Sequence, residues 1–257
     1  MRFRGVLALE DLGLTVRSGE VVGLIGPNGA GKTTAIDAVT GYVSPRSGSV
    51  RYNGRDITSW PVHRRARAGI SRSFQSLELF EDLSVSENLQ AASDRRDRLA
   101  YVTGLFRSGR ADRLSSAARE AVREFKLEPV LDKLPTDLPY GQRRLVAIAR
   151  ALATSPSVLL LDEPAAGLDT TESKELSTLI RRLAKSWGIG ILLIEHDMNV
   201  IMSSCERVVV IDFGHKIAEG TPDEIRRDPQ VIAAYLGPTH GQEQQVSAEA
   251  VPTQGLS

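Results

Sequence analysis

The sequence predicts an α/β fold with a sheet that contains buried parallel strands. Short apolar runs of strand length alternate along the chain with longer segments in which apolar residues recur at helical spacing. Two of the runs, residues 158–162 and 189–195, are almost continuously apolar and bounded by proline or glycine, as in parallel strands buried on both faces. Hydrophobic residues make up 41% of the 257 positions, enough for the core that such a sheet requires.

The first part of the chain predicts strands, a glycine-rich loop and a helix. Weak alternation over residues 6–16 and the apolar run at residues 20–25 predict two strands. Residues 32–40 have helical spacing and are followed by a glycine and a Pro-Arg-Ser-Gly turn, so they predict a helix. Residues 49–52 resemble a strand that enters a hairpin, because the Asn53-Gly54 pair readily supplies positive φ angles.

The middle of the chain predicts a helical insertion, and its end predicts a disordered tail. From residue 84 to residue 134 the sequence is charged and rich in alanine and leucine, and Ala118, Val122 and Phe125 recur at helical spacing. Arginines in this stretch are interleaved with aspartates, which favours a solvated face over a basic binding patch. Residues 238–257 are rich in Gln, Ser, Pro and Gly and too polar to offset the entropy of ordering them.

The charge balance, the cysteine content and the length of the apolar runs disfavour nucleic-acid-binding, disulfide-bonded and membrane-spanning classes of protein. The 32 Lys and Arg residues balance the 32 Asp and Glu residues, so no overall field attracts a nucleic acid or an anionic bilayer. The single cysteine, Cys205, excludes an intramolecular disulfide and is expected in the core. No apolar run approaches the roughly 20 residues that span a bilayer, and the N-terminus lacks the pattern of a secretory signal. We therefore expect no nucleic-acid partner and no membrane span.

Residues 26–33 predict a phosphate-binding loop. Their sequence, GPNGAGKT, matches the pattern G-x-x-x-x-G-K-[ST], follows an expected strand and opens an expected helix. Glycines let successive backbone N–H groups point at phosphate oxygens, and the helix N-terminus adds positive potential there. Lys32 would reach the β- and γ-phosphates, and the Thr33 hydroxyl would bind Mg²⁺. The residues expected to bind the nucleotide phosphates in this loop are Asn28, Gly29, Ala30, Gly31, Lys32, Thr33 and Thr34.

Two acidic residues at the end of a later strand complete the expected chemistry. Asp162 ends the apolar run at residues 158–162, where the metal-binding aspartate of such a site is expected. Glu163 follows directly, so one carboxylate can serve Mg²⁺ while its neighbour polarises a water for in-line attack on the γ-phosphorus. This pair predicts hydrolysis of the bound triphosphate rather than binding alone.

Further motifs resemble those of the ATP-binding cassette ATPases, and they occur in that family's order from Phe3 to Gly237. Gln75 resembles the Q-loop glutamine, which binds Mg²⁺ and links it and the attacking water to the helical subdomain. The segment AAGLD, which ends at Asp169, is similar to the D-loop that crosses the dimer interface. His196 resembles the switch histidine that contacts the γ-phosphate, and Phe3 resembles the aromatic residue that stacks on adenine.

The sequence LPYGQRR, which begins at Leu138, occupies the position of the family's signature motif. In this family the start of the signature helix clamps the γ-phosphate bound to the opposite subunit, and the resemblance assigns that role to Gly141 and Gln142. The resemblance implies a P-loop NTPase of the ATP-binding-cassette type over residues 1–237. Its mixed β core would carry an inserted α-helical subdomain at about residues 76–154.

The motifs SRSFQSLELF, IEHDM and AEGTPDEI look most like the branched-chain or hydrophobic amino-acid uptake branch of that family. In such importers two ATPase subunits drive two membrane permeases, which an extracytoplasmic solute-binding protein supplies. The resemblance therefore implies an ATP-hydrolysing subunit at the cytoplasmic face of the inner (plasma) membrane, with ATP and Mg²⁺ as ligands and an identical or different second ATPase subunit as partner. Permease contacts are expected near residues 75–88, with Glu78 and Phe80 as test positions.

Two features depart from the family pattern. The signature usually has serine where this chain has Pro139, and proline offers neither a hydroxyl nor a backbone N–H to the partner's phosphate. Its fixed φ suits the start of a helix, so we expect the fold to survive and phosphate contacts to be lost. The sequence also begins near the adenine-stacking position, without the family's first strand, so we expect Phe3 to be poorly anchored.

Three alternatives stay open. A nucleotide-gated regulatory subunit that scarcely hydrolyses ATP is favoured by Pro139, whereas Glu163 and His196 argue against it. An export-type cassette, such as those that move lipopolysaccharide, shares most of these motifs. A cassette that acts on nucleic acid is disfavoured, because only 105 positions separate Thr33 from Leu138 and repair-type cassettes carry long coiled-coil insertions there.

Overall fold

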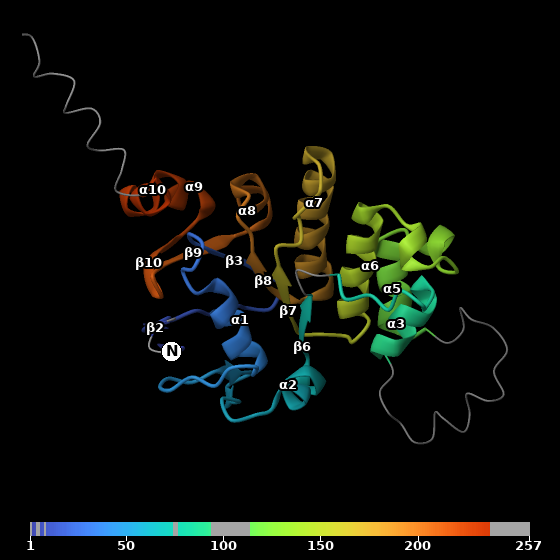
Figure 1. The fold of residues 1–257 in the computed structure, drawn as a ribbon, viewed down its shortest axis with the longest axis horizontal. Coiled ribbons are helices and arrows are strands. Elements are labelled where there is room, and N and C mark those ends of the chain that lie inside the picture. The colour runs from blue at the N-terminus through green and yellow to red at the C-terminus, as the bar shows by residue number, and fades with distance from the viewer. Residues whose placement is uncertain (1, 4–5, 8, 74–76, 94–113, 237–257) are drawn as a thin grey trace, which may run out of the picture.

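The computed structural model describes residues 2–3, 6–7, 9–73, 77–93 and 114–236. A six-stranded mixed sheet lies at the centre of this part of the chain (Figure 1). Its strand order is β10-β9-β3-β8-β7-β6, and of these neighbouring pairs only β10 and β9 are antiparallel. The α/β class with buried parallel strands is thus confirmed. The strands are β3 (Val21–Ile25), β6 (Ile70–Ser73), β7 (Val158–Asp162), β8 (Gly190–Ile194), β9 (Arg207–Asp212) and β10 (His215–Gly220).

Helices lie around this sheet, and those at its two edges form separate groups. Helices α3, α5 and α6 lie beyond the edge strand β6, whereas α9 and α10 lie beside β10 at the other edge (Figure 1). Among the residues described, no helix is both long and apolar enough to cross a membrane. The helices are α1 (Lys32–Thr40), α2 (Val62–Ala68), α3 (Val85–Ser93), α5 (Ser116–Glu124), α6 (Tyr140–Leu152), α7 (Thr170–Trp187), α8 (Met198–Ser204), α9 (Pro222–Arg227) and α10 (Pro229–Leu236), with 3₁₀ turns at Glu128–Val130 and Pro135–Asp137.

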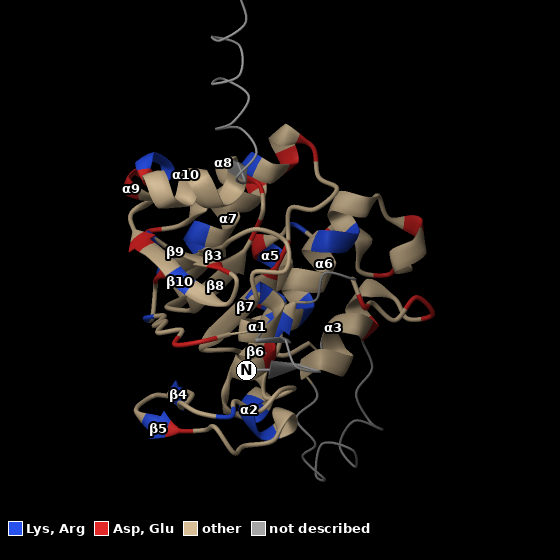
Figure 2. Cartoon of the chain, turned by 60° about the vertical axis from the view of Figure 1, so that its left-hand side comes forward, with Lys and Arg blue, Asp and Glu red and all other residues tan. Residues whose placement is uncertain are grey.

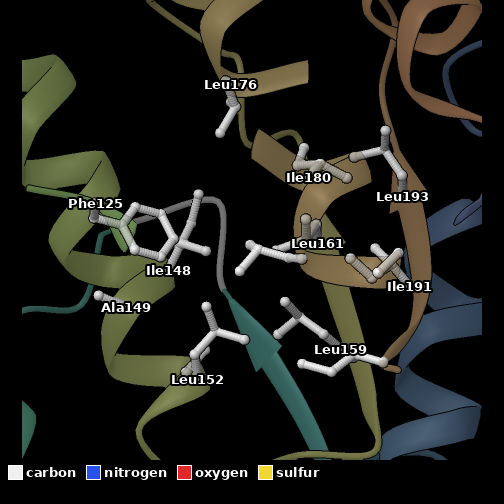
Figure 3. Packing of buried hydrophobic residues seen from close by; sticks show 14 of the residues in the cluster. Phe125, Ile148, Ala149, Leu152, Leu159, Leu161, Leu176, Ile180, Ile191 and Leu193 are labelled. Atoms are coloured by element: carbon white, nitrogen blue, oxygen red, sulfur yellow. The ribbon is translucent and has the colours of Figure 1, made fainter. Parts of the chain in front are cut away.

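Alternate residues of the central strands face two separate apolar clusters. Leu159 and Leu161 of β7 belong to one cluster, and Leu160 between them belongs to the other. The first cluster packs the strands against α6 and against α7, where Ile180 is fully buried (Figure 3). The second packs the opposite face against α1 through Ile36. Because both faces are covered, these strands have almost no polar positions, which explains the continuous apolar runs in the sequence.

Several local predictions are confirmed by the structure. The helix predicted over residues 32–40 is α1, with the same bounds. Strand β4 (Arg51–Tyr52) pairs with β5 (Arg55–Asp56) in the predicted hairpin, and the two residues between them, Asn53 and Gly54, have φ angles of 48° and 76°. Cys205 is a free thiol that packs partly buried against the first cluster. Burial raises the pKa of this thiol above its ordinary value.

The strand predicted over residues 6–16 is wrong for most of its length. Within this range the described strand is β2 (Val6–Leu7), paired antiparallel with β1 (Arg2–Phe3), and the described residues 9–20 form none. Leu12 and Leu14 are instead half-buried against the second cluster. The apolar side chains in this segment therefore reflect packing against the sheet rather than strand pairing.

The predicted helical insertion is partly described. Helices α3, α5 and α6 lie in it, and Ala118, Val122 and Phe125 are buried as their spacing predicts. Residues 94–113, which hold most of the interleaved arginines, and the tail at 238–257 lie outside the described residues. The domain boundaries stay predictions.

Figure 2 shows acidic and basic residues interspersed over the elements, in agreement with the balanced charge of the sequence.

Candidate nucleotide-binding and hydrolysis site

The phosphate-binding loop connects β3 to α1. Gly29 and Gly31 have φ angles of 81° and 108°, in the left-handed region that side chains disfavour. A Cβ on Gly26 would lie 2.0 Å from the carbonyl oxygen of Ile211, so only glycine fits there. Gly31 caps α1 without any side-chain hydrogen bond, which leaves backbone N–H groups at the helix start for an anion.

The side chain of Lys32 folds back onto the phosphate-binding loop and contacts its backbone. Its Nζ donates to the carbonyl oxygens of Gly26 at 2.7 Å and Pro27 at 3.0 Å. Burial lowers the pKa of Lys32, while the nearby Glu163 and Asp162 carboxylates act in the opposite direction. The same ammonium can therefore turn from the loop carbonyls to phosphate oxygens, with the two acidic residues close by.

Other loop residues contribute differently. The side chain of Ala30 is buried at 2% exposure, and its N–H donates to Pro27 at 3.1 Å, so Ala30 shapes the turn. Asn28 and Gly29 are exposed at the tip, and Thr33 is exposed in the first turn of α1, with Thr34 half-buried beside it.

Asp162 ends β7 and is held by an arginine that the sequence analysis missed. Nη2 of Arg72, on β6, lies 2.9 Å from Oδ2 of Asp162, and its Nη1 lies 2.7 Å from Oδ1 of Asp37 on α1. Pairing of β6 with β7 brings Arg72 to this position. The guanidinium thus connects the expected metal ligand to the helix that follows the phosphate loop.

Glu163 and His196 approach each other beyond the ends of β7 and β8. Oε2 of Glu163 lies 4.0 Å from Nδ1 of His196, and the His196 side chain is 66% exposed. The backbone N–H of Glu163 donates to Ile194 at 2.9 Å, and Glu163 has a φ of 49°, which is unusual for a residue with a side chain. The strand ends therefore fix the backbone from which the two predicted catalytic side chains extend.

Glu195 lies beneath this pair and was not predicted as a site residue. It is 1% exposed, and its carboxylate accepts a hydrogen bond from the N–H of Ala165 at 2.7 Å. Burial raises the pKa of Glu195, and the N–H of Ala165 acts against that rise. The signal in the sequence was its place at the end of a buried strand, directly before His196.

The signature segment packs against the predicted D-loop within this chain. Pro139 caps α6 with a φ of −55° and no side-chain hydrogen bond, so proline fits the helix start as predicted. The Tyr140 ring lies against Gly167, where a Cβ would be 2.9 Å from it. Asp169 caps α7, accepting from the N–H groups of Thr171 and Glu172 at 2.7 and 2.8 Å. In Figure 1, α6 lies on the far side of β7 from α1.

Gly141, Gln142 and Asp169 are therefore carried by the region around α6 and the start of α7, not by the phosphate loop. Gln142 is exposed, and Gly141 is half-buried beside Glu172. Gln75 and the side chain of Phe3 lie outside the described residues, although the backbone of Phe3 pairs with Val6 in the β1–β2 hairpin.

Comparison with known families identifies the fold and its chemistry. Residues 9–166 match the family model described as ABC transporter. The chain belongs to the ABC transporter family. Residues 215–237, which include β10, α9 and α10, match the model described as branched-chain amino acid ATP-binding cassette transporter. The predicted P-loop NTPase of ATP-binding-cassette type, with its mixed β core, is confirmed, and so is the ATPase class.

Curated relatives extend over most of the chain. It is 42% identical over 241 residues to the high-affinity branched-chain amino acid transport ATP-binding protein BraF of Pseudomonas aeruginosa, covering 92% of this chain and 94% of BraF. The corresponding protein LivG of Salmonella typhimurium is 42% identical over 242 residues, with the same coverage. The lipopolysaccharide export system ATP-binding protein LptB of Escherichia coli is 41% identical over 235 residues, covering 91% and 93%.

Solved structures agree with this assignment. The ADP conformation of MJ1267, an ATP-binding cassette of an ABC transporter, superposes with a TM-score of 0.80 at 28% identity, covering 92% of this chain and 95% of that one. The dimeric structure of MJ0796, a bacterial ABC transporter cassette, has a TM-score of 0.69 at 27% identity, covering 84% and 91%. The fold is therefore one on which an ADP-bound state and a dimeric cassette are both known.

Proposed function

We propose that this chain is the ATP-hydrolysing subunit of a membrane importer for branched-chain or other hydrophobic amino acids. The observation that carries the solute class is the match of residues 215–237 to the branched-chain cassette model. The alternative function, the ATPase of an export system, is favoured by one specific observation, the 41% identity to LptB. The C-terminal match and the names of BraF and LivG favour import.

The proposed mechanism begins with ATP in the loop between β3 and α1. Backbone N–H groups of residues 28–34 and the ammonium of Lys32 would bind the phosphates, and Phe3 would stack on adenine. Glu163 would take a proton from the attacking water, and His196, close to it at 4.0 Å, would contact the γ-phosphate. Gly141, Gln142 and Asp169 would act on the nucleotide of a second ATPase subunit.

The donor set suits Mg²⁺. The hydroxyl of Thr33 and the carboxylate of Asp162 are oxygen donors, and Gln75 would add an amide oxygen. Across the described residues no group of three or more His, Cys, Asp and Glu side chains forms a metal site by itself. Mg²⁺ commonly binds through one or two protein groups together with phosphates, and it would neutralise charge between the β- and γ-phosphates.

The proposed partners are a second ATPase subunit, two permeases and, through them, an extracytoplasmic solute-binding protein, at the cytoplasmic face of the inner membrane. The region expected to meet a permease presents Phe80, which is 45% exposed, with the guanidinium of Arg150 4.6 Å from its ring centre. Arg150 also donates to the carbonyl oxygen of Glu78, whose φ is 45°. These contacts support a preformed surface in the described part of the expected permease region, residues 77–88.

Reconstitution of the importer tests the proposed function. The chain would be combined in liposomes with its partner ATPase and permeases, and ATP-driven uptake of leucine would be measured. We expect uptake with the native chain and none with Lys32→Ala, because the ammonium that binds the phosphates is lost. The Lys174→Ala variant, at an exposed position of α7, serves as the control. ATP hydrolysis without uptake of any branched-chain amino acid would contradict the import assignment.

Restoring serine in the signature tests the effect of Pro139. In the assembled complex we expect Pro139→Ser to raise ATP turnover several-fold, because serine restores a hydroxyl and an N–H to the partner's phosphate. Thermal stability should change little, since Pro139 already has the geometry of a helix cap. Turnover equal to that of the native complex would mean that this signature does not limit hydrolysis.

A further inference from the structure

Glu195 connects two segments of the site that lie far apart in sequence. Its Oε1 accepts the N–H of Ala165 at 2.7 Å, 30 positions away, in the segment that follows Glu163. Its Oε2 accepts the N–H of His196 at 3.3 Å and lies 3.8 Å from Nδ1 of the same residue. One carboxylate thus contacts both the start of the D-loop segment and the switch histidine.

The surroundings of Glu195 exclude direct participation in hydrolysis. Its side chain has no exposure to solvent, and both oxygens already accept hydrogen bonds from backbone N–H groups. A buried carboxylate without such donors would be strongly destabilising, so these contacts stabilise its position. Glu163, whose side chain is 25% exposed, is the carboxylate that solvent reaches.

The backbone between Glu163 and Ala165 is held at several points. The N–H of Glu163 donates to Ile194 at 2.9 Å, and its carbonyl oxygen accepts from Ala166 at 3.2 Å. The contact from Glu195 to Ala165 closes this arrangement on the side of His196. The strand ends therefore fix the start of both segments, and the buried side chain of Glu195 adds a contact between the residues that follow Glu163 and the residue before His196.

We propose that Glu195 is a positioning residue, which keeps Glu163 and His196 directed at the same γ-phosphate by binding the D-loop segment to the switch histidine. This inference rests on the proposed function, because it assigns Glu195 a role in that same hydrolysis.

Glu195→Gln is the first test, measured as ATP hydrolysis in the reconstituted complex. Glutamine keeps the shape and one carbonyl acceptor but directs an NH₂ group at a backbone N–H, so one of the two contacts is lost. We expect kcat to fall about 10-fold or more, with KM for ATP within about twofold of native, because the phosphate loop is unchanged. Glu195→Asp, which keeps the charge but is one methylene shorter, should behave in the same way.

Glu206→Gln is the matched control. Glu206 also binds a backbone N–H of a neighbouring strand, that of Val21 at 2.7 Å, but at the opposite end of β3 from the phosphate loop. We expect kcat of Glu206→Gln to be unchanged and its Tm to fall less than that of the Glu195 variants, because the Glu206 side chain is 38% exposed whereas that of Glu195 is fully buried. A Glu195→Gln protein with lowered Tm and native kcat would show a structural role only and overturn the proposal.

Glu163→Gln separates this inference from the proposed function. If Glu163→Gln abolishes hydrolysis and both Glu195 variants keep native kcat, the positioning role is wrong while the proposed function stands. If the native complex hydrolyses no ATP, the proposed function itself fails, whatever the Glu195 variants do; if hydrolysis persists in Glu163→Gln, only the assignment of Glu163 as the base fails. A reduced kcat in both Glu195 variants, with native binding of a fluorescent ATP analogue, supports the positioning role.

Discussion

Replacing Glu163 by glutamine is expected to reduce steady-state ATP hydrolysis by about 100-fold to 10,000-fold, the range that a positioned general base contributes. Glutamine keeps the size of the side chain but accepts a proton poorly. ATP binding should persist, since the phosphate loop and Lys32 are unchanged. ATP-bound dimers should therefore accumulate in the variant, because closure no longer ends in hydrolysis.

The measurement is phosphate release by the chain assembled with its ATPase partner and permeases, together with dimer formation by size-exclusion chromatography in ATP and Mg²⁺. Glu175→Gln, at an exposed position of α7, is the control and should keep native turnover. Equal turnover of native and Glu163→Gln would remove Glu163 as the base. Equal inactivity with ATP still bound would identify a nucleotide-gated subunit, with Pro139 as the first residue to test.

The parts of the fold that local sequence determines were predicted well. Helix α1 begins directly after Gly31 and ends at Gly41, both in left-handed conformations, so its bounds are visible in the sequence. The strand expected over residues 6–16 was mostly wrong, because strand pairing depends on a distant partner that alternation alone does not reveal. In residues 9–16 the apolar side chains pack against the sheet, but the backbone does not pair with it as a strand.

The same distinction applies to the site. Lys32, Asp162 and Glu163 were predicted because their motifs are short and each follows an expected strand. Arg72 and Glu195 were not, since their partners Asp162 and Ala165 lie 90 and 30 positions away, and the local signal for Glu195, its place directly after a buried strand, does not reveal its partner. Arg72 lies on β6 and Glu195 directly follows β8, and their roles are evident only when the sheet brings those partners together.

Removing the guanidinium of Arg65 is expected to cost about 3–5 kcal/mol of the free energy of unfolding, the range for breaking a buried charged network. Arg65 is 1% exposed and donates to four backbone carbonyl oxygens. Two belong to Ala38 and Val39 in the last turn of α1, at 2.6 and 2.8 Å, and the others to Thr58 and Trp60, at 2.7 and 3.0 Å. In Arg65→Met these oxygens would be buried without a donor.

Urea unfolding of Arg65→Met and Arg67→Met provides the comparison. Arg67 is exposed on α2, the helix that also holds Arg65, so its replacement should change the free energy of unfolding by less than about 0.5 kcal/mol. Because the cation also lies at the C-terminal end of α1, its loss removes a favourable interaction with the helix dipole. If both variants unfold at the same urea concentration, water must reach these carbonyls, and the end of α1 is less enclosed than the burial of Arg65 indicates.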